Sequence, residues 1–470
     1  MSVTDTDSIN HSPTSKKSKP LSVLTELKAL LSLAIPIMGS QLAQTANGFV
    51  DAVMAGGVSP LDLAAVAVGS SIWVPVYLFM SGILMATTPF VAQLVGANEK
   101  EKIGAWVQQA LWLALLIGVI GFFTIRNADL LMIWLNVDQD IQILSSKYLD
   151  AISWGVMPIA FFVVLRAYSE GMAYALPMTV ISVIGLLINI PANYVFIYGM
   201  FGVQAMGGEG CGWATSLVMA LMCLLMVLYV LVHPQYAGTR VFRHFKKPDF
   251  PRWLSLLQIG LPIGISIFIE VSVFSIVALM IGSLGSSIVA SHQIALNFAS
   301  MVFMLPLSIG MALTVRIGHA MGNKSYLRVR HTAHVGVAFT GVLALCLALL
   351  IASFRDFIPN LYTDDVSVKF LAASLLLYAA MFQLSDGLQA AALGSLRGMK
   401  DTRSPMFITL FAYWGIALPL GYSLGLGDFI GIKMGPQGFW IGLLAGLTVA
   451  AILLNYRLFT HLKTLNPENA

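Results

Sequence analysis

Residues 34–56 read AIPIMGSQLAQTANGFVDAVMAG, and they belong to an apolar run that extends from about residue 25 to residue 54. A helix needs roughly 20 such residues to cross the hydrocarbon core of a bilayer, so this run is long enough to span a membrane. Its outer half carries one carboxylate, Asp51, that lipid would reject. The stretch therefore predicts a spanning helix with one face turned towards protein or water.

The rest of the 470-residue chain has the same character. Hydrophobic residues make up 58% and charged residues only 10%, against roughly 25% charged residues in soluble domains, which excludes a soluble enzyme, a disordered chain and a coiled coil. Three cysteines without CxxC spacing indicate neither a disulfide framework nor a zinc site. Eleven more apolar runs lie at roughly 63–90, 105–124, 148–168, 176–200, 211–233, 254–282, 288–313, 333–354, 370–392, 405–426 and 436–459. The sequence thus predicts an all-α polytopic membrane protein with twelve transmembrane helices.

The distribution of basic residues predicts how these helices are oriented. If all twelve runs span, 21 of the 26 Lys and Arg residues fall on one side of the membrane and five on the other. Cytoplasmic loops collect positive charge, so the side with 21 is expected to be cytoplasmic and to hold both termini. This bias is a simpler explanation of the basic segment from His233 to Trp253 than binding of a nucleic acid, and no nucleic-acid partner is expected.

An internal repeat divides the chain. Shifting the sequence against itself by 226–228 residues aligns Pro36 with Pro262 and then a series of further residues in the same order. These further pairs are Ser40 with Ser266, Gly96 with Gly322, Pro177 with Pro405, Pro191 with Pro419, Tyr194 with Tyr422, Met206 and Gly207 with Met434 and Gly435, and Gly210 with Gly438. Because six helices is an even number, both halves enter the bilayer in the same direction and are related by a pseudo-twofold axis along the membrane normal.

The repeat predicts the domain organisation. We expect a six-helix N-terminal lobe over residues 25–233 and a six-helix C-terminal lobe over 254–460, with a cavity between them and a cytoplasmic linker at 234–253. Residues 1–24 and 461–470 are expected to be cytoplasmic tails. The first tail is expected to be disordered because it is polar and lacks the apolar core of a signal peptide.

Polar residues inside the predicted spans mark a candidate site in the first half. A charged residue at the centre of a spanning helix costs about 2.5–3.5 kcal/mol and normally has a function. Asp51 shares a helix face with Gln44 and Asn47, at spacings of four and three residues. With Asn189 and Asn193 of another span, these residues are predicted to form one hydrated polar pocket. The alternative is that Asp51 is an interfacial carboxylate near the outer end of a long helix.

The second half has its own polar set around Glu270 and Asp386, which lie deeper in their spans. The other polar residues of this set are Ser266, one turn before Glu270, Gln293 and Asn297, four apart in the span at 288–313, and Gln383 and Gln389, each three residues from Asp386. His292, at the start of that same span, is expected to be interfacial. Carboxylate, amide and hydroxyl oxygens are the hard ligands that Na⁺ accepts, and the same carboxylates can carry a proton. Glu270 and Asp386 are therefore candidate ligands of Na⁺ or carriers of H⁺, whereas the amides can alternatively serve only to bridge helices.

Four segments in order resemble the multidrug and toxic compound extrusion (MATE) transporters, and in particular their NorM-like bacterial branch. The segments are AIPIMGSQLAQTANGFVDAVMAG around Asp51, RAYSEGM with INIPANYVFIYG, GLPIGISIFIE ending at Glu270, and QLSDGLQAAALGSLRGMKDTRSP around Asp386. The resemblance covers the chain from about residue 25 to residue 460.

This resemblance implies two lobes around a V-shaped cavity in a bacterial inner-membrane protein that exports cationic or amphipathic drugs and dyes by alternating access, driven by Na⁺ or H⁺. It assigns Glu270 and Asp386 to a cation site of the C-terminal lobe, and Asp51, Asn189 and Asn193 to an acidic site of the N-terminal lobe. It implies no enzymatic activity, no cofactor besides the coupling ion, and a monomer in the lipid bilayer. Phe382 departs from the pattern, because relatives can have a Tyr hydroxyl near the cation at this position.

Rival classes lack their motifs in this sequence. The major facilitator superfamily, also built from six plus six helices, usually has G-x-x-x-D-R-x-G-R-R between its second and third helices, where this chain has GANEKEKIG. A polytopic membrane enzyme would need a motif such as HExxH or GxSxG with a partnered His, and ATP-driven transport would need GxxxxGK; none occurs. A channel is a further alternative, and it differs from an ion-coupled transporter in that its ligand flux would not respond to ion gradients. A lipid-like or metabolite cargo is an alternative to drugs.

Overall fold

A computed structural model describes residues 22–134, 137–243, 246–427 and 434–465. Most of the two predicted tails, residues 1–21 and 466–470, therefore lies outside the described residues. Within the described ranges the chain folds into helices without any strand, and 12 helical segments are long and apolar enough to cross a membrane. The predicted all-α class and the predicted number of spans are confirmed.

The first half contains eight helices, of which α2 and α3 together form one span. They are α1 (Val23–Gly56), α2 (Pro60–Leu84), α3 (Thr87–Gly96), α4 (Lys100–Arg126), the short α5 (Asp129–Trp134), α6 (Gln139–Gly171), α7 (Leu176–Tyr198) and α8 (Gly208–Val232). The helices extend beyond the apolar runs because polar residues cap their ends. At the start of α2, for example, the Ser59 hydroxyl accepts a hydrogen bond from the backbone N–H of Asp62 at 3.0 Å.

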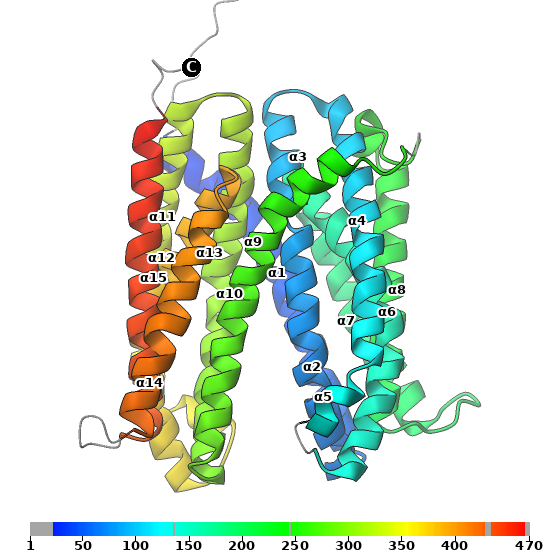
Figure 1. Ribbon diagram of the computed structural model, residues 1–470, viewed down its shortest axis with the longest axis vertical. Helices are drawn as coiled ribbons and strands as arrows, with labels where there is room; N and C mark the ends of the chain where they lie inside the picture. Colours follow the sequence, from blue (N-terminus) through cyan, green and yellow to red (C-terminus); the bar gives the residue numbers. More distant parts are fainter. Residues whose placement is uncertain (1–21, 135–136, 244–245, 428–433, 466–470) are drawn as a thin grey trace, which may run out of the picture.

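The second half repeats this plan. Its elements are the 3₁₀ turn η1 (Pro234–Thr239), α9 (Phe250–Gly282), α10 (Ser286–Gly322), α11 (Tyr326–Phe354), the 3₁₀ turn η2 (Ile358–Leu361), α12 (Val366–Gly398), α13 (Arg403–Leu410), the π-helical segment η3 (Phe411–Ala417), α14 (Leu418–Gly425) and α15 (Pro436–Thr464). The eleventh span thus consists of α13, η3 and α14 in series. Figure 1 shows the two halves as two lobes standing side by side, with α9 running diagonally from above the first lobe into the second.

The backbone confirms the internal duplication. Three pairs of residues 226–228 positions apart have matching left-handed φ angles, a conformation that is uncommon outside glycine. They are Asn98 (59°) with Lys324 (50°), Ala173 (65°) with Lys400 (63°), and Gly207 (59°) with Gly435 (61°). Local turns as well as spans therefore follow the pseudo-twofold axis.

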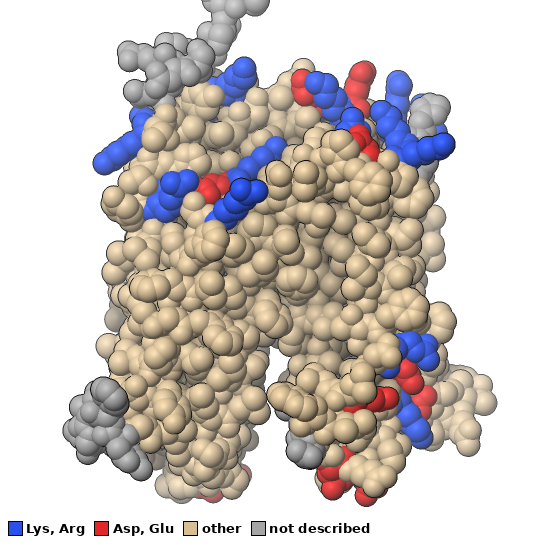
Figure 2. All heavy atoms as spheres, in the orientation of Figure 1, with Lys and Arg blue, Asp and Glu red and all other residues tan. Residues whose placement is uncertain are grey.

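The lobes pack tightly at one end and part at the other. At the packed end, a Cβ atom on Gly96 would come within 2.0 Å of the His319 carbonyl oxygen, and one on Gly322 within 1.9 Å of the Gln93 carbonyl oxygen. Because these two contacts are equivalent in the repeat, α3 and α10 cross at the pseudo-twofold axis with no side chain between them. Figure 2 shows that Lys and Arg gather at this packed end and that the molecule is hollowed between the lobes at the opposite end.

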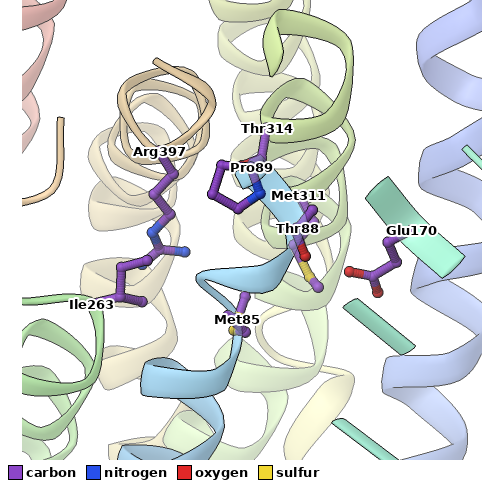
Figure 3. Close-up of a pocket in the computed structure, with 8 residues that line it drawn as sticks. All are labelled: Met85, Thr88, Pro89, Glu170, Ile263, Met311, Thr314 and Arg397. Atoms are coloured by element: carbon purple, nitrogen blue, oxygen red, sulfur yellow. The ribbon is translucent and has the colours of Figure 1, made fainter. Parts of the chain in front are cut away.

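A small cavity remains on the axis within the packed end (Figure 3). Six of its lining residues are repeat equivalents, namely Met85 with Met311, Thr88 with Thr314, and Glu170 with Arg397. Glu170 and Arg397 come from different lobes and carry opposite charges at equivalent positions. The backbones of the two lobes are thus pseudo-symmetric where they meet, but the side chains at these equivalent positions differ in charge.

The linker is bound to the first lobe. Gln108 and Gln109 of α4 each bind the linker through both ends of the amide, donating to the carbonyls of Val241 (2.6 Å) and Lys247 (2.9 Å) and accepting from the backbone N–H groups of Lys246 (3.1 Å) and Asp249 (2.8 Å). The Trp112 indole donates to the Lys246 carbonyl at 3.0 Å. The described part of the linker therefore lies along α4 rather than between the lobes.

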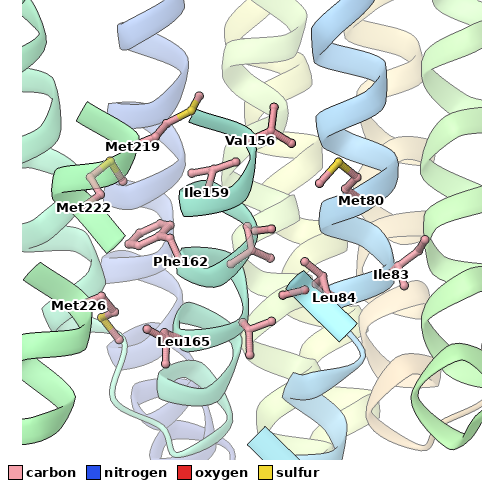
Figure 4. Close-up of a cluster of buried hydrophobic side chains, with 14 of the residues drawn as sticks. Met80, Ile83, Leu84, Val156, Ile159, Phe162, Leu165, Met219, Met222 and Met226 are labelled. Carbon is pink, nitrogen blue, oxygen red and sulfur yellow. The ribbon is translucent and has the colours of Figure 1, made fainter. Parts of the chain in front are cut away.

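The interior of each lobe is a conventional apolar core. Figure 4 shows the core of the first lobe, where Phe162 of α6 points towards Met222 of α8, near Met226, while Leu84 of α2 lies on the other side of α6. These four side chains are at most 2% exposed. Such close packing holds the spans in place and makes the few buried polar groups stand out.

Candidate functional site

The Asp51 carboxylate is enclosed by three helices of the first lobe. Its Oδ1 accepts hydrogen bonds from the side-chain amides of Asn193 (2.6 Å) and Asn189 (3.2 Å) on α7, and its Oδ2 accepts one from the Thr215 hydroxyl (2.7 Å) on α8. Asp51 is 5% exposed. The structure therefore places Asp51 inside the lobe rather than at an interface with water, in the pocket that the sequence predicts.

This pocket is not fully satisfied. The Asn193 amide also donates to Asn189 Oδ1 at 2.9 Å, but Asn193 Oδ1 and Asn47 Oδ1 are buried without a hydrogen-bond partner among the described residues. A buried acceptor without a donor is costly, so the pocket has capacity for a proton donor or a cation. The contacts follow from the four-residue spacing of Asn189 and Asn193, which sets both amides on one face of α7.

Gln44 belongs to a neighbouring network on the same helix. Its Oε1 accepts from the Tyr77 hydroxyl at 3.2 Å, and its Nε2 donates to the Ser40 hydroxyl at 3.3 Å. Ser40 in turn is hydrogen-bonded to Ser182 of α7 at 2.8 Å. Gln44 thus links α1 to α2 and α7 and makes no hydrogen bond to Asp51.

The second lobe brings Glu270 of α9 and Asp386 of α12 together. The two carboxylates interact electrostatically, and the Tyr413 hydroxyl of η3 interacts with Glu270. The Gln389 amide donates to the Tyr413 hydroxyl at 2.8 Å, which fixes the tyrosine in the site. Three spans therefore contribute to one polar cluster, in which Asp386, Gln389 and Tyr413 are buried and Glu270 is partly buried.

Asp386 has an oxygen that is free to bind an ion, and so does Gln383, which lies one turn earlier on α12. Asp386 Oδ1 and both amide atoms of Gln383 are buried and have no hydrogen-bond partner among the described residues. Carboxylate, amide and hydroxyl oxygens from Glu270, Asp386, Gln383 and Tyr413 suit Na⁺, and the two carboxylates equally suit a proton. The described residues include no group of three or more His, Cys, Asp or Glu side chains of the kind that holds a transition metal.

The Arg397 guanidinium connects this cluster with the packed end. Arg397 interacts electrostatically with Glu270 and also lines the axial cavity opposite Glu170 (Figure 3). Glu170 has its own partner, Arg166, whose Nε lies 2.9 Å from Glu170 Oε1. Arg397 thus partly compensates the negative charge of Glu270.

Other residues from the sequence prediction lie apart from this cluster. The Ser266 hydroxyl donates to the Pro262 carbonyl of its own helix at 2.8 Å, and Gln293 and Asn297 lie exposed on α10. Phe382 is buried and stacks on Trp440, with ring centroids 5.5 Å apart. Amides at helical spacing can face a cleft or lipid as readily as a pocket. The spacing of Gln293 and Asn297 alone therefore did not predict which way their side chains face.

The prediction that His292 is interfacial is wrong. His292 is 1% exposed, and its Nδ1 accepts a hydrogen bond from the Trp440 indole at 3.2 Å. The residue lies near the start of its helix in sequence, but the Trp440 side chain of α15 contacts it there, and the side chain is buried.

Two contributors, Thr215 and Tyr413, were not predicted from the sequence. Thr215 is a single hydroxyl in an apolar span, and nothing in its neighbourhood distinguishes it from a helix-bonded threonine. Tyr413 lies in the π-helical segment η3, and π-helical turns occur frequently at functional sites. Its hydroxyl reaches the cluster from η3 and not from α12, the helix that carries Phe382.

The two clusters are not copies of each other. At the offset of the repeat, Asp51 corresponds to Val277, Asn189 to Ala417, and Asp386 to Ile159. Twelve spans in two pseudo-twofold lobes, with a different polar cluster buried in each and a cleft between them, define a two-lobed membrane transporter.

Comparisons with known proteins assign the family. The MatE family model matches residues 36–195 and 262–423, one stretch in each lobe. The chain is 48% identical over 433 residues to "Probable multidrug resistance protein NorM" of Shewanella oneidensis, covering 92% of this chain and 94% of that protein. It is 48% identical over 449 residues to "Multidrug resistance protein PmpM" of Pseudomonas aeruginosa, covering 95% and 94%. The chain belongs to the MatE family.

Solved structures of low sequence identity share the fold. The crystal structure of the eukaryotic MATE transporter AtDTX14 superposes with a TM-score of 0.86 at 20% identity, covering 94% of this chain and 98% of that one. A structure described as the outward-facing conformation of a multidrug resistance MATE family transporter gives 0.84 at 22% identity, covering 96% and 100%. The resemblance of four sequence segments to MATE transporters is therefore confirmed.

Proposed function

We propose that the chain is a secondary active multidrug efflux transporter that exports cationic or amphipathic drugs and dyes in exchange for Na⁺ or H⁺. The observation that carries the proposal is the pair Glu270 and Asp386, which interact electrostatically; Asp386 is buried, and its Oδ1 has no hydrogen-bond partner among the described residues. Neighbouring carboxylates repel each other, and a bound cation or proton removes that repulsion. The names of the relatives as multidrug resistance proteins support drugs as the cargo.

The orientation in the membrane follows from charge. We propose that the packed end, where Lys and Arg gather in Figure 2, faces the cytoplasm of a bacterial inner membrane, with both termini and the linker on that side. The cleft then opens outward, in the state from which a drug is released. The cavity between the two lobes belongs to one chain, which supports a monomer, and transport needs neither chemical turnover nor a cofactor besides the coupling ion.

Dye efflux from proteoliposomes tests the proposal. We expect a cationic dye to move against its gradient when Na⁺ is imposed across the bilayer at equal pH, or when a pH gradient is imposed without Na⁺. The two gradients are applied separately, so the response identifies the ion. Flux that ignores both gradients would indicate a channel, and failure of drugs to compete with the dye, combined with competition by lipid-like amphiphiles, would favour the alternative cargo.

Cysteine accessibility tests the orientation. In a background with Cys211, Cys223 and Cys346 replaced by Ser, we expect Arg243→Cys to react only with reagents that enter the cytoplasm. Asp364→Cys, at the opposite end of the molecule, is expected to react with impermeant reagents from outside. Both positions are exposed, so access to the side chain does not limit labelling. Labelling of position 243 but not 364 from outside would reverse the topology.

A further inference from the structure

The packed end contains two interfaces that are equivalent in the repeat but differ in chemistry. At the offset of 226 residues, each of three positions on one side of the axis has a counterpart on the other. The counterparts are Glu26 with Arg252, Phe90 with Arg316, and Trp106 with Thr332. In one interface the start of α1 meets α10 and α11, and in the other the start of α9 meets α4, which packs on α3.

The first interface is ionic. Glu26 is 1% exposed, and its Oε1 accepts hydrogen bonds from Arg316 Nε (3.0 Å), Arg316 Nη2 (2.8 Å) and the Thr332 hydroxyl (2.9 Å). Its Oε2 accepts another from Arg316 Nη2 at 2.7 Å. All four contacts cross from the first lobe to the second. The carboxylate is thus enclosed, bidentately paired and fully satisfied in the closed arrangement.

The second interface is aromatic. Phe90 and Trp106 stack with their centroids 4.4 Å apart, and two cations from the second lobe lie over them. Arg252 Cζ is 5.7 Å from the Trp106 ring centre, and Lys400 Nζ is 3.9 Å from the Phe90 ring centre. Arg252 also pairs with Asp249 of its own segment at 3.3 Å, with both side chains about one-third exposed. The lobes are therefore joined here by cation–π contacts and not by an ion pair.

We propose that these two interfaces are the latches that hold the packed end closed while the cleft is open at the other end. The ionic latch is Glu26 with Arg316 and Thr332, and the aromatic latch is Phe90 and Trp106 with Arg252 and Lys400. Glu26 and Arg316 act as positioning residues of the transport cycle, although neither belongs to an ion or drug cluster. The proposal rests on the proposed function, since a closed packed end matters only for alternating access.

The two latches respond differently to the loss of one partner. Removing Arg316 leaves the Glu26 carboxylate, which is 1% exposed, enclosed and unpaired. Removing Glu26 leaves the Arg316 guanidinium, whose side chain is 19% exposed, without its ionic partner. Either change destabilises the closed state, whereas opening returns the remaining charge to water. Removing Arg252 leaves the aromatic stack in place and no enclosed charge without a partner. The ionic latch therefore dominates closure, and its loss should favour opening at the packed end.

Distances between spin labels on Lys102→Cys in α4 and Leu327→Cys in α11, both exposed at the packed end, measure this opening in the cysteine-free background. We expect Glu26→Gln to lower the ratio of closed to open molecules about thirtyfold or more. The double variant Glu26→Gln with Arg316→Gln leaves no unpaired charge, and it should return to within about threefold of the wild-type ratio. The matched change Arg252→Gln should shift the ratio about fivefold at most.

The outcome is decisive in either direction. A wild-type distance distribution in monodisperse Glu26→Gln protein, or a double variant that opens as far as both single variants combined, would overturn the proposal. The measurement needs neither drug nor ion, so it is independent of the efflux assay. If wild-type vesicles show no gradient-driven efflux but Glu26→Gln still opens the packed end, the proposed function fails and the latches stand.

Discussion

Glu270→Gln and Asp386→Asn are each expected to reduce gradient-driven dye efflux to the level of empty vesicles, while the amount of folded protein in the membrane stays near wild type. Each change removes one of the two carboxylates that interact electrostatically in the second lobe and the negative charge that attracts the coupling ion. Folding is spared because a charged side chain within a span opposes insertion by about 2.5–3.5 kcal/mol, and the amide lowers this cost. Efflux in proteoliposomes and monodispersity after detergent extraction measure the two effects.

Ser385→Ala is the matched control for Asp386→Asn. Ser385 is the adjacent residue on α12, but its hydroxyl is hydrogen-bonded to Thr448 of α15 at 3.0 Å, away from the carboxylates. We expect this variant to transport like wild type. Wild-type efflux in Glu270→Gln or Asp386→Asn would remove that carboxylate from the coupling site, and loss of efflux in Ser385→Ala would indicate general sensitivity of α12.

Asp51→Asn is expected to bind drug but no longer to release it when Na⁺ is added or the pH is shifted, with loss of efflux. Coupling requires ion and drug to favour different states, so that each weakens binding of the other by the same factor. The Asp51 carboxylate holds α1, α7 and α8 together through Asn189, Asn193 and Thr215, and its neutralisation removes the charge that an ion in this pocket would compensate. Drug affinity in detergent, with and without each ion, measures the coupling.

Thr215→Val separates charge from packing at this site. It removes the hydrogen bond to Asp51 Oδ2 and keeps the carboxylate charge and nearly the same side-chain volume. We expect ion-induced drug release to be weakened, by a factor of about 10 to 150 for a single hydrogen bond to a charged group, but not abolished. Unchanged ion-induced release in Asp51→Asn would show that the carboxylate only stabilises the lobe.

The spans and the duplication were predictable because each is encoded in many residues at once. Each of the twelve apolar runs has bilayer length, so its identification as a span does not depend on any single residue. The symmetry follows from an ordered series of repeated prolines and glycines. The details that interrupt regular helix were not predictable. The turn at Met85 and Ala86 between α2 and α3 and the π-helical segment around Tyr413 arise from packing between helices, which hydropathy does not record.

The polar sites were predictable in part, according to how the residues are brought together. Asp51 lies on α1, and Asn189 and Asn193 lie four residues apart on α7. The polar faces of these two helices contact each other inside the lobe. Gln293 and Asn297 have the same spacing but lie on an exposed face of α10. A polar pair becomes a site only when a neighbouring helix supplies a partner, as Thr215 and Tyr413 do.

The attachment of the linker to α4 changes how the covalent connection between the lobes acts. A free segment of about twenty residues would hold the second lobe near the first only as a loose tether, at an effective concentration set by the statistics of a random coil. Here the amides of Gln108 and Gln109 bind its backbone as far as Asp249, directly before α9 begins at Phe250. The unattached part of the connection between the lobes is therefore only a few bonds long and is not a flexible loop. The conformational entropy that a free linker would lose when the two lobes associate is already lost when the linker binds to the folded first lobe.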